Sequence, residues 1–294
     1  KKKKKKKKGM ESQLLSACKD GRTEEVKQLL SNPNINPNYQ DNSVGWTPLI
    51  YACFQGHLNV VKLLLLDERI DVNKTDLSGS TAQQSACEMG HIEVTKLLLN
   101  DSRVDINKAD HMGWTPFYLA CLNGHIGVIK VLLNDERVDV NKTDHYSFTP
   151  LYSVCQFGQT EVMRVLLSSQ RIEVDKTDNY KNTPLHLACQ NGNLEILKLL
   201  LNDERVDVNK KTDVGETPLS LACYTERIEV VQYMLASDRN INFHSKNIHG
   251  KSAIDLVRED GAINLLRLLE TFESNPYETK MRLRNQLGLS GKNF

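Results

Sequence analysis

The sequence contains no apolar run that approaches the ~18 residues needed to cross a membrane, and its longest leucine-rich run, residues 60–66, is interrupted by Lys62. It also lacks the apolar core of a secretory signal peptide, because Glu11 and Ser12 follow the basic N-terminal stretch. Only 16 glycines and 8 prolines occur among 294 residues, too few for a low-complexity chain. These absences favour a cytoplasmic protein, with the nucleus as an alternative location, over a secreted or membrane protein.

Motifs that carry catalysis are missing as well. There is no H-E-x-x-H, G-x-S-x-G or G-x-G-x-x-G pattern. Residues 288–292, with the sequence GLSGK, are only loosely similar to a phosphate-binding loop, because the first glycine is wrongly spaced and no Ser or Thr follows the lysine. The sequence therefore predicts no enzyme activity and no cofactor.

The charge is dominated by one N-terminal segment. Lys1–Lys8 is a run of eight lysines followed by Gly9 and Met10, which we interpret as an expression tag; a natural polybasic anchor is the alternative. Without these eight, 30 of the 38 basic residues remain against 37 acidic ones, a net charge of −7. A mildly acidic body argues against nucleic acid as a partner.

The seven cysteines reveal an internal repeat. They are separated by one gap of 35 and five gaps of 34 residues, and five Thr-Pro pairs keep the same period. A period of this length is typical of solenoid proteins. The cysteines are Cys18, Cys53, Cys87, Cys121, Cys155, Cys189 and Cys223.

One repeat unit predicts two short helices. Thr115 is a favourable N-cap and Pro116 suits the first helical position, while Gly124 ends the first helix. Apolar residues at helical spacing predict a second helix over residues 125–133, followed by a polar link over residues 134–141. Neither helix could bury its apolar face alone, so neighbouring units must stack.

These units closely resemble the ankyrin repeat. Residues 183–189 read TPLHLAC, and the Gly-His pairs at 56–57, 90–91 and 124–125 and the Asp-Val-Asn turns, such as residues 139–141, also follow the family pattern. The resemblance covers about residues 11–272. It implies an all-α fold, an α-solenoid with short β-hairpin or turn loops between helix pairs.

We expect eight units and two flanking segments. Residues 1–9 are expected to be a disordered tag, and residues 273–294 an amphipathic helix and tail. The ankyrin domain spans residues 10–272, with an N-terminal cap repeat at 10–41, inner repeats at 42–242 and a C-terminal cap repeat at 243–272. The third unit, with Gln83 and Ser85, and the seventh, with Glu226-Arg227 in place of Gly-His, should be points of weaker stacking.

The cysteines do not predict a metal site or disulfides. Equivalent positions in adjacent units should lie ~8–10 Å apart, whereas a disulfide needs Cα atoms within about 7 Å. We interpret each cysteine as a small buried packing residue, and the Cys-x-x-x-His spacing as a by-product of the repeat.

The resemblance also implies where a partner binds. In the ankyrin fold, the hairpin tips and the first helices form a concave groove, and its variable positions here are rich in aromatic residues and methionine, which favour recognition surfaces. Packing between adjacent hairpins is the alternative role for these rings. The positions are Trp46, Phe54, Leu77, Met89, His111, Met112, Trp114, Leu122, His145, Tyr146, Phe148, Phe157, Tyr180 and Tyr224.

We therefore predict a monomeric, non-enzymatic scaffold that binds another protein or a peptide carrying apolar and basic residues. The alternative is a regulatory module that masks an enzyme or its substrate site. The resemblance also implies that the protein is a possible substrate of asparaginyl hydroxylases. These enzymes modify the asparagine of an L-x₅-[DE]-[VI]-N pattern, which here contains Asn73, Asn107, Asn141 and Asn209.

A C-terminal helix is predicted after the last repeat. Asn275, Pro276 and Glu278 form a helix start, and the helix should run to about Leu287. Its apolar face would cover the open end of the last unit, or would dock elsewhere. The expected face is Tyr277, Met281, Leu283 and Leu287.

Overall fold

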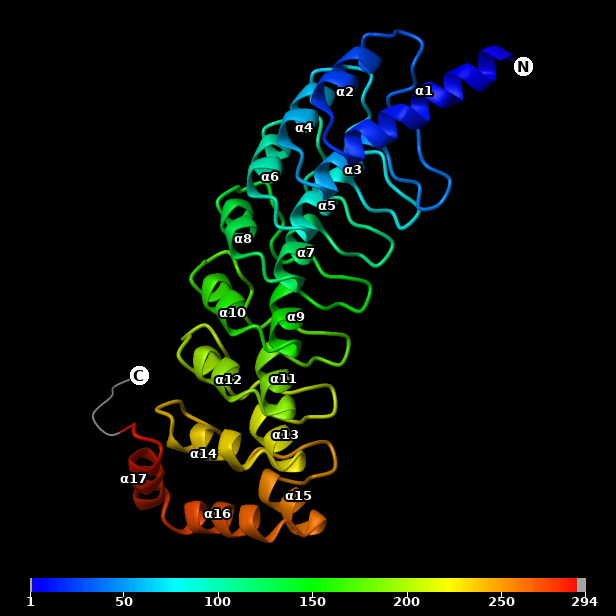
Figure 1. Ribbon diagram of the computed structural model, residues 1–294. Coiled ribbons are helices and arrows are strands. Elements are labelled where there is room, and N and C mark those ends of the chain that lie inside the picture. The colour runs from blue at the N-terminus through cyan, green and yellow to red at the C-terminus, as the bar shows by residue number, and fades with distance from the viewer. Residues whose placement is uncertain (1, 290–294) are drawn as a thin grey trace. The chain divides into compact units, whose positions relative to one another are not determined.

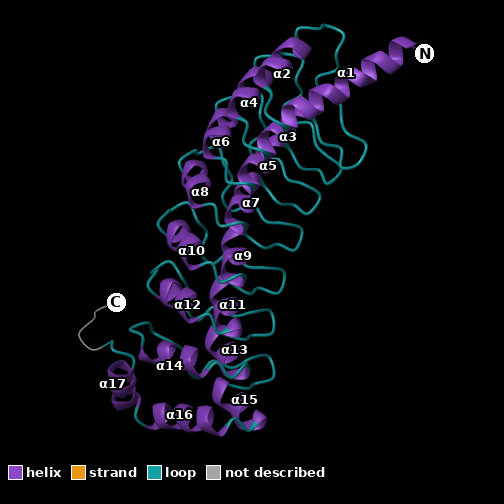
Figure 2. Ribbon diagram, in the orientation of Figure 1, coloured by secondary structure: helices purple, strands orange, loops and turns teal. Residues whose placement is uncertain are grey.

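The computed structural model describes residues 2–289, and among them it contains helices and loops but no strand (Figure 2). No helix in this range is both long and apolar enough to cross a membrane. The chain divides into two compact units, Lys1–His145 and Tyr146–Phe294.

The first unit consists of four helix pairs. The first helices of the pairs pack in one row, and the second helices pack in a parallel row behind them (Figure 1). The pairs are α1 (Lys2–Lys19) with α2 (Thr23–Leu30), α3 (Pro48–Phe54) with α4 (Leu58–Leu65), α5 (Ala82–Glu88) with α6 (Ile92–Leu99), and α7 (Pro116–Leu122) with α8 (Ile126–Leu133).

The second unit repeats this arrangement and adds one helix. Its last helix, α17 (Pro276–Gln286), packs against α14 and α16. The pairs are α9 (Pro150–Gln156) with α10 (Thr160–Leu167), α11 (Pro184–Asn191) with α12 (Leu194–Leu201), α13 (Pro218–Tyr224) with α14 (Ile228–Ala236), and α15 (Ala253–Asp260) with α16 (Ile263–Ser274).

The Thr-Pro pairs begin the first helices, as the sequence predicts. The Thr47 side chain accepts a hydrogen bond from the Ile50 amide at 3.1 Å, and Thr115 accepts one from Tyr118 in the same way. Each threonine satisfies one of the free amides of a helix N-terminus, and the proline that follows has no amide to satisfy. The 34-residue period of the Thr-Pro pairs therefore marks where the first helix of each repeat begins.

The Gly-His pairs link each repeat to the preceding one. The ring Nε2 of His91 lies 2.9 Å from the Phe54 carbonyl, and His125 makes the same contact with the Glu88 carbonyl at 2.7 Å. In the seventh repeat Arg227 takes this place and donates to the Gln190 carbonyl. The expected weak point of the seventh repeat therefore retains this contact.

Arginines in the polar links join the second helices. Arg103 donates to the Leu65 carbonyl at 2.8 Å and forms an ion pair with Asp101, and Arg137 makes the equivalent contact with the Leu99 carbonyl. Such contacts use carbonyls that a helix C-terminus leaves without partners.

The asparagines of the Asp-Val-Asn turns form a second chain of links. Asn73 donates to the Arg103 carbonyl at 2.7 Å and accepts from the Asp105 amide at 2.8 Å. Asn107 repeats both bonds one repeat later. Asp175 occupies this position in its repeat, where Oδ2 accepts from the Asp207 amide, while the buried Oδ1 has no partner among the described residues.

The seven cysteines lie in the core between the two rows of helices of each unit. All seven are buried and free. Burial raises the pKa of the Cys87 thiol to about 12, so these thiols stay protonated at neutral pH.

The N-terminal end of the chain differs from the sequence-based expectation. Residues 1–9 were expected to be disordered, but α1 begins at Lys2 and continues to Lys19, because lysine is a good helix former and extends the first helix. Residues 290–294 of the expected C-terminal tail lie outside the described residues.

The predicted C-terminal helix is present as α17, but its buried face is different. Leu283, Thr279 and Arg284 are buried, whereas Tyr277 and Met281 are exposed. Arg284 donates to Asp238 at 3.0 Å and to the Ala236 carbonyl, both next to the end of α14. The ion pair with Asp238 holds the Arg284 side chain in the buried face of α17. The spacing of apolar residues in the sequence did not predict this.

Candidate functional site

A hollow of about 620 Å³ lies in the first unit, and we call it the unit-1 hollow. Three loops, residues 31–47, 66–81 and 100–115, form one wall, and helices α3, α5 and α7 form the other. The lining is mostly apolar and aromatic. Its main side chains are Trp46, Phe54, Asp76, Leu77, Glu88, Asp110, His111, Met112 and Trp114.

Trp46 is held rigidly at one end of the hollow. Its ring packs edge-on against Tyr51, with centroids 4.9 Å apart, and at a tilt against Phe54 at 4.7 Å. Its indole N–H donates to Oδ2 of Asp76 at 3.1 Å. Three contacts therefore fix the orientation of this indole before any ligand binds.

Trp114 is held differently, although it occupies the equivalent position two repeats later. Its ring stacks on Tyr118 with an interplanar angle of 11°. The Tyr118 hydroxyl donates to Asp144, the counterpart of the aspartate that Trp46 uses. The Trp114 indole N–H is consequently buried without a hydrogen-bond partner among the described residues.

Two apolar side chains of the loops extend into solvent beside the indoles. Leu77 is 67% exposed and Met112 is 42% exposed. Exposed apolar groups that gather around a concave surface are typical of a binding site for another molecule. Their backbones hold the loops together, since the Leu77 amide donates to the Val44 carbonyl and the Met112 amide to Asp110, while their side chains remain open to solvent.

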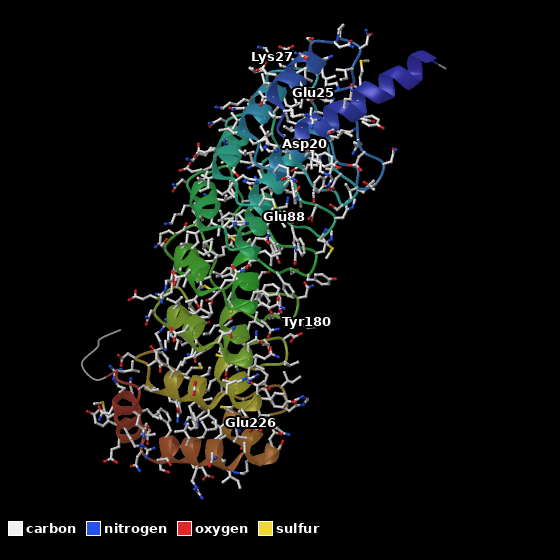
Figure 3. All side chains as sticks on the ribbon, in the orientation of Figure 1. Asp20, Glu25, Lys27, Glu88, Tyr180 and Glu226 are labelled. Carbon is white, nitrogen blue, oxygen red and sulfur yellow. The ribbon has the colours of Figure 1, made fainter. Side chains whose placement is uncertain are left out.

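The hollow is also acidic. Asp110 uses Oδ1 to accept from the amides of Met112 and Trp114, which closes the loop. The carboxylate of Glu88, at the end of α5 (Figure 3), accepts no hydrogen bond from the described residues, although the Glu88 carbonyl is in contact with His125. Burial raises the pKa of Glu88, and the carboxylates of Asp110 and Asp76 raise it further. Glu88 is therefore close enough to both aspartates for their negative charges to act on it.

The predicted aromatic residues of the second unit either stack on one another or extend into solvent. Tyr146 stacks on Phe148, which in turn stacks on Tyr152 with centroids 4.6 Å apart. Phe148 is half-buried, so part of its role is packing. Phe157, Tyr180 and Tyr224 are exposed, and Tyr180 projects from a loop (Figure 3).

The predicted site residues thus divide into groups. The structure brings together Trp46, Phe54, Leu77, His111, Met112 and Trp114 around the unit-1 hollow. Met89 is exposed and Leu122 half-buried at the ends of α5 and α7, and His145 is exposed on a loop. Their part in binding stays a prediction.

The sequence analysis missed the acidic component of this surface. It considered none of Asp76, Glu88 and Asp110. The signal was present, because Asp76 and Asp110 recur 34 residues apart, each immediately before a variable position, Leu77 and His111.

Comparison with protein families agrees with this architecture. A model of three ankyrin repeats matches residues 1–76, 65–144 and 136–212, and a model of a single ankyrin repeat matches residues 214–247. The chain belongs to the ankyrin-repeat family, whose members are generally protein–protein interaction modules and typically lack enzymatic activity. A search of curated proteins found no match.

Proposed function

We propose that this chain is a non-enzymatic scaffold that captures a peptide segment of a partner protein at the unit-1 hollow. The observation that carries the proposal is the exposure of Leu77 and Met112 beside two oriented indoles. Burying these side chains against a partner would contribute about 25 cal/mol per Å² of apolar area removed from water.

The preformed geometry supports capture of an extended or looped segment. Trp46 is already oriented by Tyr51, Phe54 and Asp76, so binding would cost little side-chain entropy there. Tryptophan is among the residues most often found at the energetic centre of protein interfaces.

Selection from a library of random 12-residue peptides displayed on phage tests this proposal, with the protein lacking residues 1–8 as the target. We expect enriched peptides that bind the original chain and lose at least about tenfold in affinity for a Leu77→Ser/Met112→Ser variant. The matched control is Leu66→Ser, because Leu66 is 79% exposed at the end of α4, away from the hollow.

Thermal unfolding of the three proteins should coincide, because all three positions are on the surface. Peptides that bind the double variant as tightly as the original chain would contradict the proposal, and so would a failure to enrich any peptide.

A further inference from the structure

The carboxylates of the unit-1 hollow have no counter-charge. Among residues 9–289, Asp76, Glu88 and Asp110 form no ion pair, although ion pairs are frequent elsewhere on this chain. Oδ2 of Asp110 and both oxygens of Glu88 accept no hydrogen bond from the described residues. The one basic side chain that lines the hollow is His111.

Aromatic faces share the hollow with this negative charge. Trp46 and Trp114 both line it, and indole is the aromatic side chain that attracts cations most strongly. A hollow that offers indole faces together with unpaired carboxylates complements a planar cation, since such a cation can stack on a ring and donate hydrogen bonds at its edge.

Arginine fits these two features better than lysine. Its guanidinium is planar, weakly hydrated and carries five N–H donors, whereas the lysine ammonium is a compact and strongly hydrated charge. The mostly apolar lining, with Leu77 and Met112 at its rim, would also pack against the methylene groups of an arginine stem.

We propose that the unit-1 hollow is a binding site for one arginine side chain of the captured peptide, with its guanidinium against one of the two indoles and its N–H groups on Glu88 and Asp110. This inference rests on the proposed function, because it names the side chain that the scaffold recognises. It assigns to Glu88 the preference for a positively charged side chain. The Glu88 carboxylate makes no hydrogen bond within the described residues, so it is available to a ligand.

The test uses the tightest peptide from the phage selection, synthesised with a fluorescent label in three forms. One form keeps its arginine, one replaces it by citrulline, which is a neutral analogue of the same shape, and one replaces it by lysine. Fluorescence anisotropy gives the Kd of each form for the original chain, for Glu88→Gln and for Glu68→Gln. The last is the matched control, because Glu68 is exposed on the link after α4 and carries the same charge.

We expect the citrulline form to bind the original chain about tenfold more weakly than the arginine form, and the lysine form to be intermediate. Glu88→Gln should weaken the arginine form about fivefold, leave the citrulline form unchanged and reduce the salt dependence of binding, whereas Glu68→Gln should change none of these.

Enriched peptides without arginine, or equal affinities of the arginine and citrulline forms, would overturn the inference. If such peptides still lose binding to the Leu77→Ser/Met112→Ser variant, the scaffold function stands and only the arginine site fails. If no peptide depends on Leu77 and Met112, both proposals fail.

Discussion

At the scale of single residues, position 83 carries an amide where five other repeats bury an apolar side chain. Gln83 is 1% exposed, and among the described residues its side chain makes a weak hydrogen bond from Nε2 to the Cys87 sulfur at 3.7 Å. Its Oε1 is buried without a partner among the described residues. The equivalent side chains are Leu49, Phe117, Leu151, Leu185 and Leu219.

Replacing Gln83 by Leu should therefore stabilise the fold. The change removes an unsatisfied buried acceptor, whose cost is about 1–3 kcal/mol, and supplies the side chain that the other repeats use. We expect a higher midpoint of urea unfolding for Gln83→Leu and a lower one for the reverse control, Leu185→Gln. An unchanged or lower midpoint for Gln83→Leu would contradict this, because it would show that Oε1 of Gln83 has a hydrogen-bond donor in solution.

His186 is a second buried polar residue, and it is fully satisfied. Its ring Nδ1 accepts from the Thr183 amide at 3.1 Å, and Nε2 lies 3.2 Å from the Glu216 carbonyl. Burial lowers the pKa of His186 to about 4, although backbone hydrogen bonds to Glu216 and Lys210 and the charge of Asp178 oppose this shift. The ring is consequently neutral in the folded chain at pH 7.

Acid should weaken the fold through this histidine. Because its folded pKa lies below the ordinary value of 6.5, its contribution is complete above pH 6.5 and is lost as the pH falls to about 4. Gln84 occupies the same position in the third repeat and makes the equivalent bonds, so His186→Gln should fold without this titration.

The free energy of unfolding of the original chain should fall by roughly 3 kcal/mol relative to His186→Gln between pH 6.5 and pH 4. Urea unfolding of both proteins across this range measures the difference. Parallel pH profiles would contradict the pKa shift of His186.

At the scale of elements, the turns between repeats are joined by side-chain amides, and one turn departs from the rule. Asp175 stands where Asn73 and Asn107 each donate to a backbone carbonyl and accept from a backbone amide. A carboxylate can accept but cannot donate. Burial raises the pKa of Asp175, while the hydrogen bond from the Asp207 amide and the charges of Lys210 and Arg239 oppose this rise.

Asp175→Asn should restore the missing bond and raise stability at pH 7 by about 1–2 kcal/mol. Because the folded pKa of Asp175 is raised above 3.8, a protonated Asp175 stabilises the fold below that pH, and the advantage of asparagine should appear as the pH rises. Amide hydrogen exchange of residues 203–209 measures the effect locally. Equal exchange rates in both proteins at pH 7 would contradict it.

Most helices of this chain could be predicted from the sequence, because each begins and ends with a strong local signal. Thr115 and Pro116 begin α7, and Gly124 follows its end. The N-terminal extension of α1 and the buried face of α17 could not be predicted in this way. The first depends on helix propensity alone, and the second on the ion pair between Arg284 and Asp238, which are 46 residues apart.

At the scale of the whole molecule, the repeat pattern predicted the solenoid but only part of the candidate site. Comparison of the repeats with one another identified Trp46, Leu77, Met112 and Trp114. The residue type at these positions differs from repeat to repeat, whereas the residues that build the helices and turns recur. This comparison did not identify Glu88, whose importance depends on two carboxylates from other segments. Proximity of charges that are distant in sequence is a property of the folded unit.

The second unit has its own exposed aromatic residues, Tyr180 and Tyr224 among them. The second unit contains neither of the chain's two tryptophans, which both line the unit-1 hollow. The account therefore assigns recognition to the first unit, and this assignment is its central claim.

The most direct test is a nuclear magnetic resonance titration of the two tryptophan indole N–H signals. The chain contains two tryptophans, and both line the unit-1 hollow, so each signal reports on its occupancy. As the arginine peptide is added, we predict that both indole signals move and reach saturation at one peptide per chain. Saturating binding that leaves both signals unmoved would place the partner elsewhere and contradict the account.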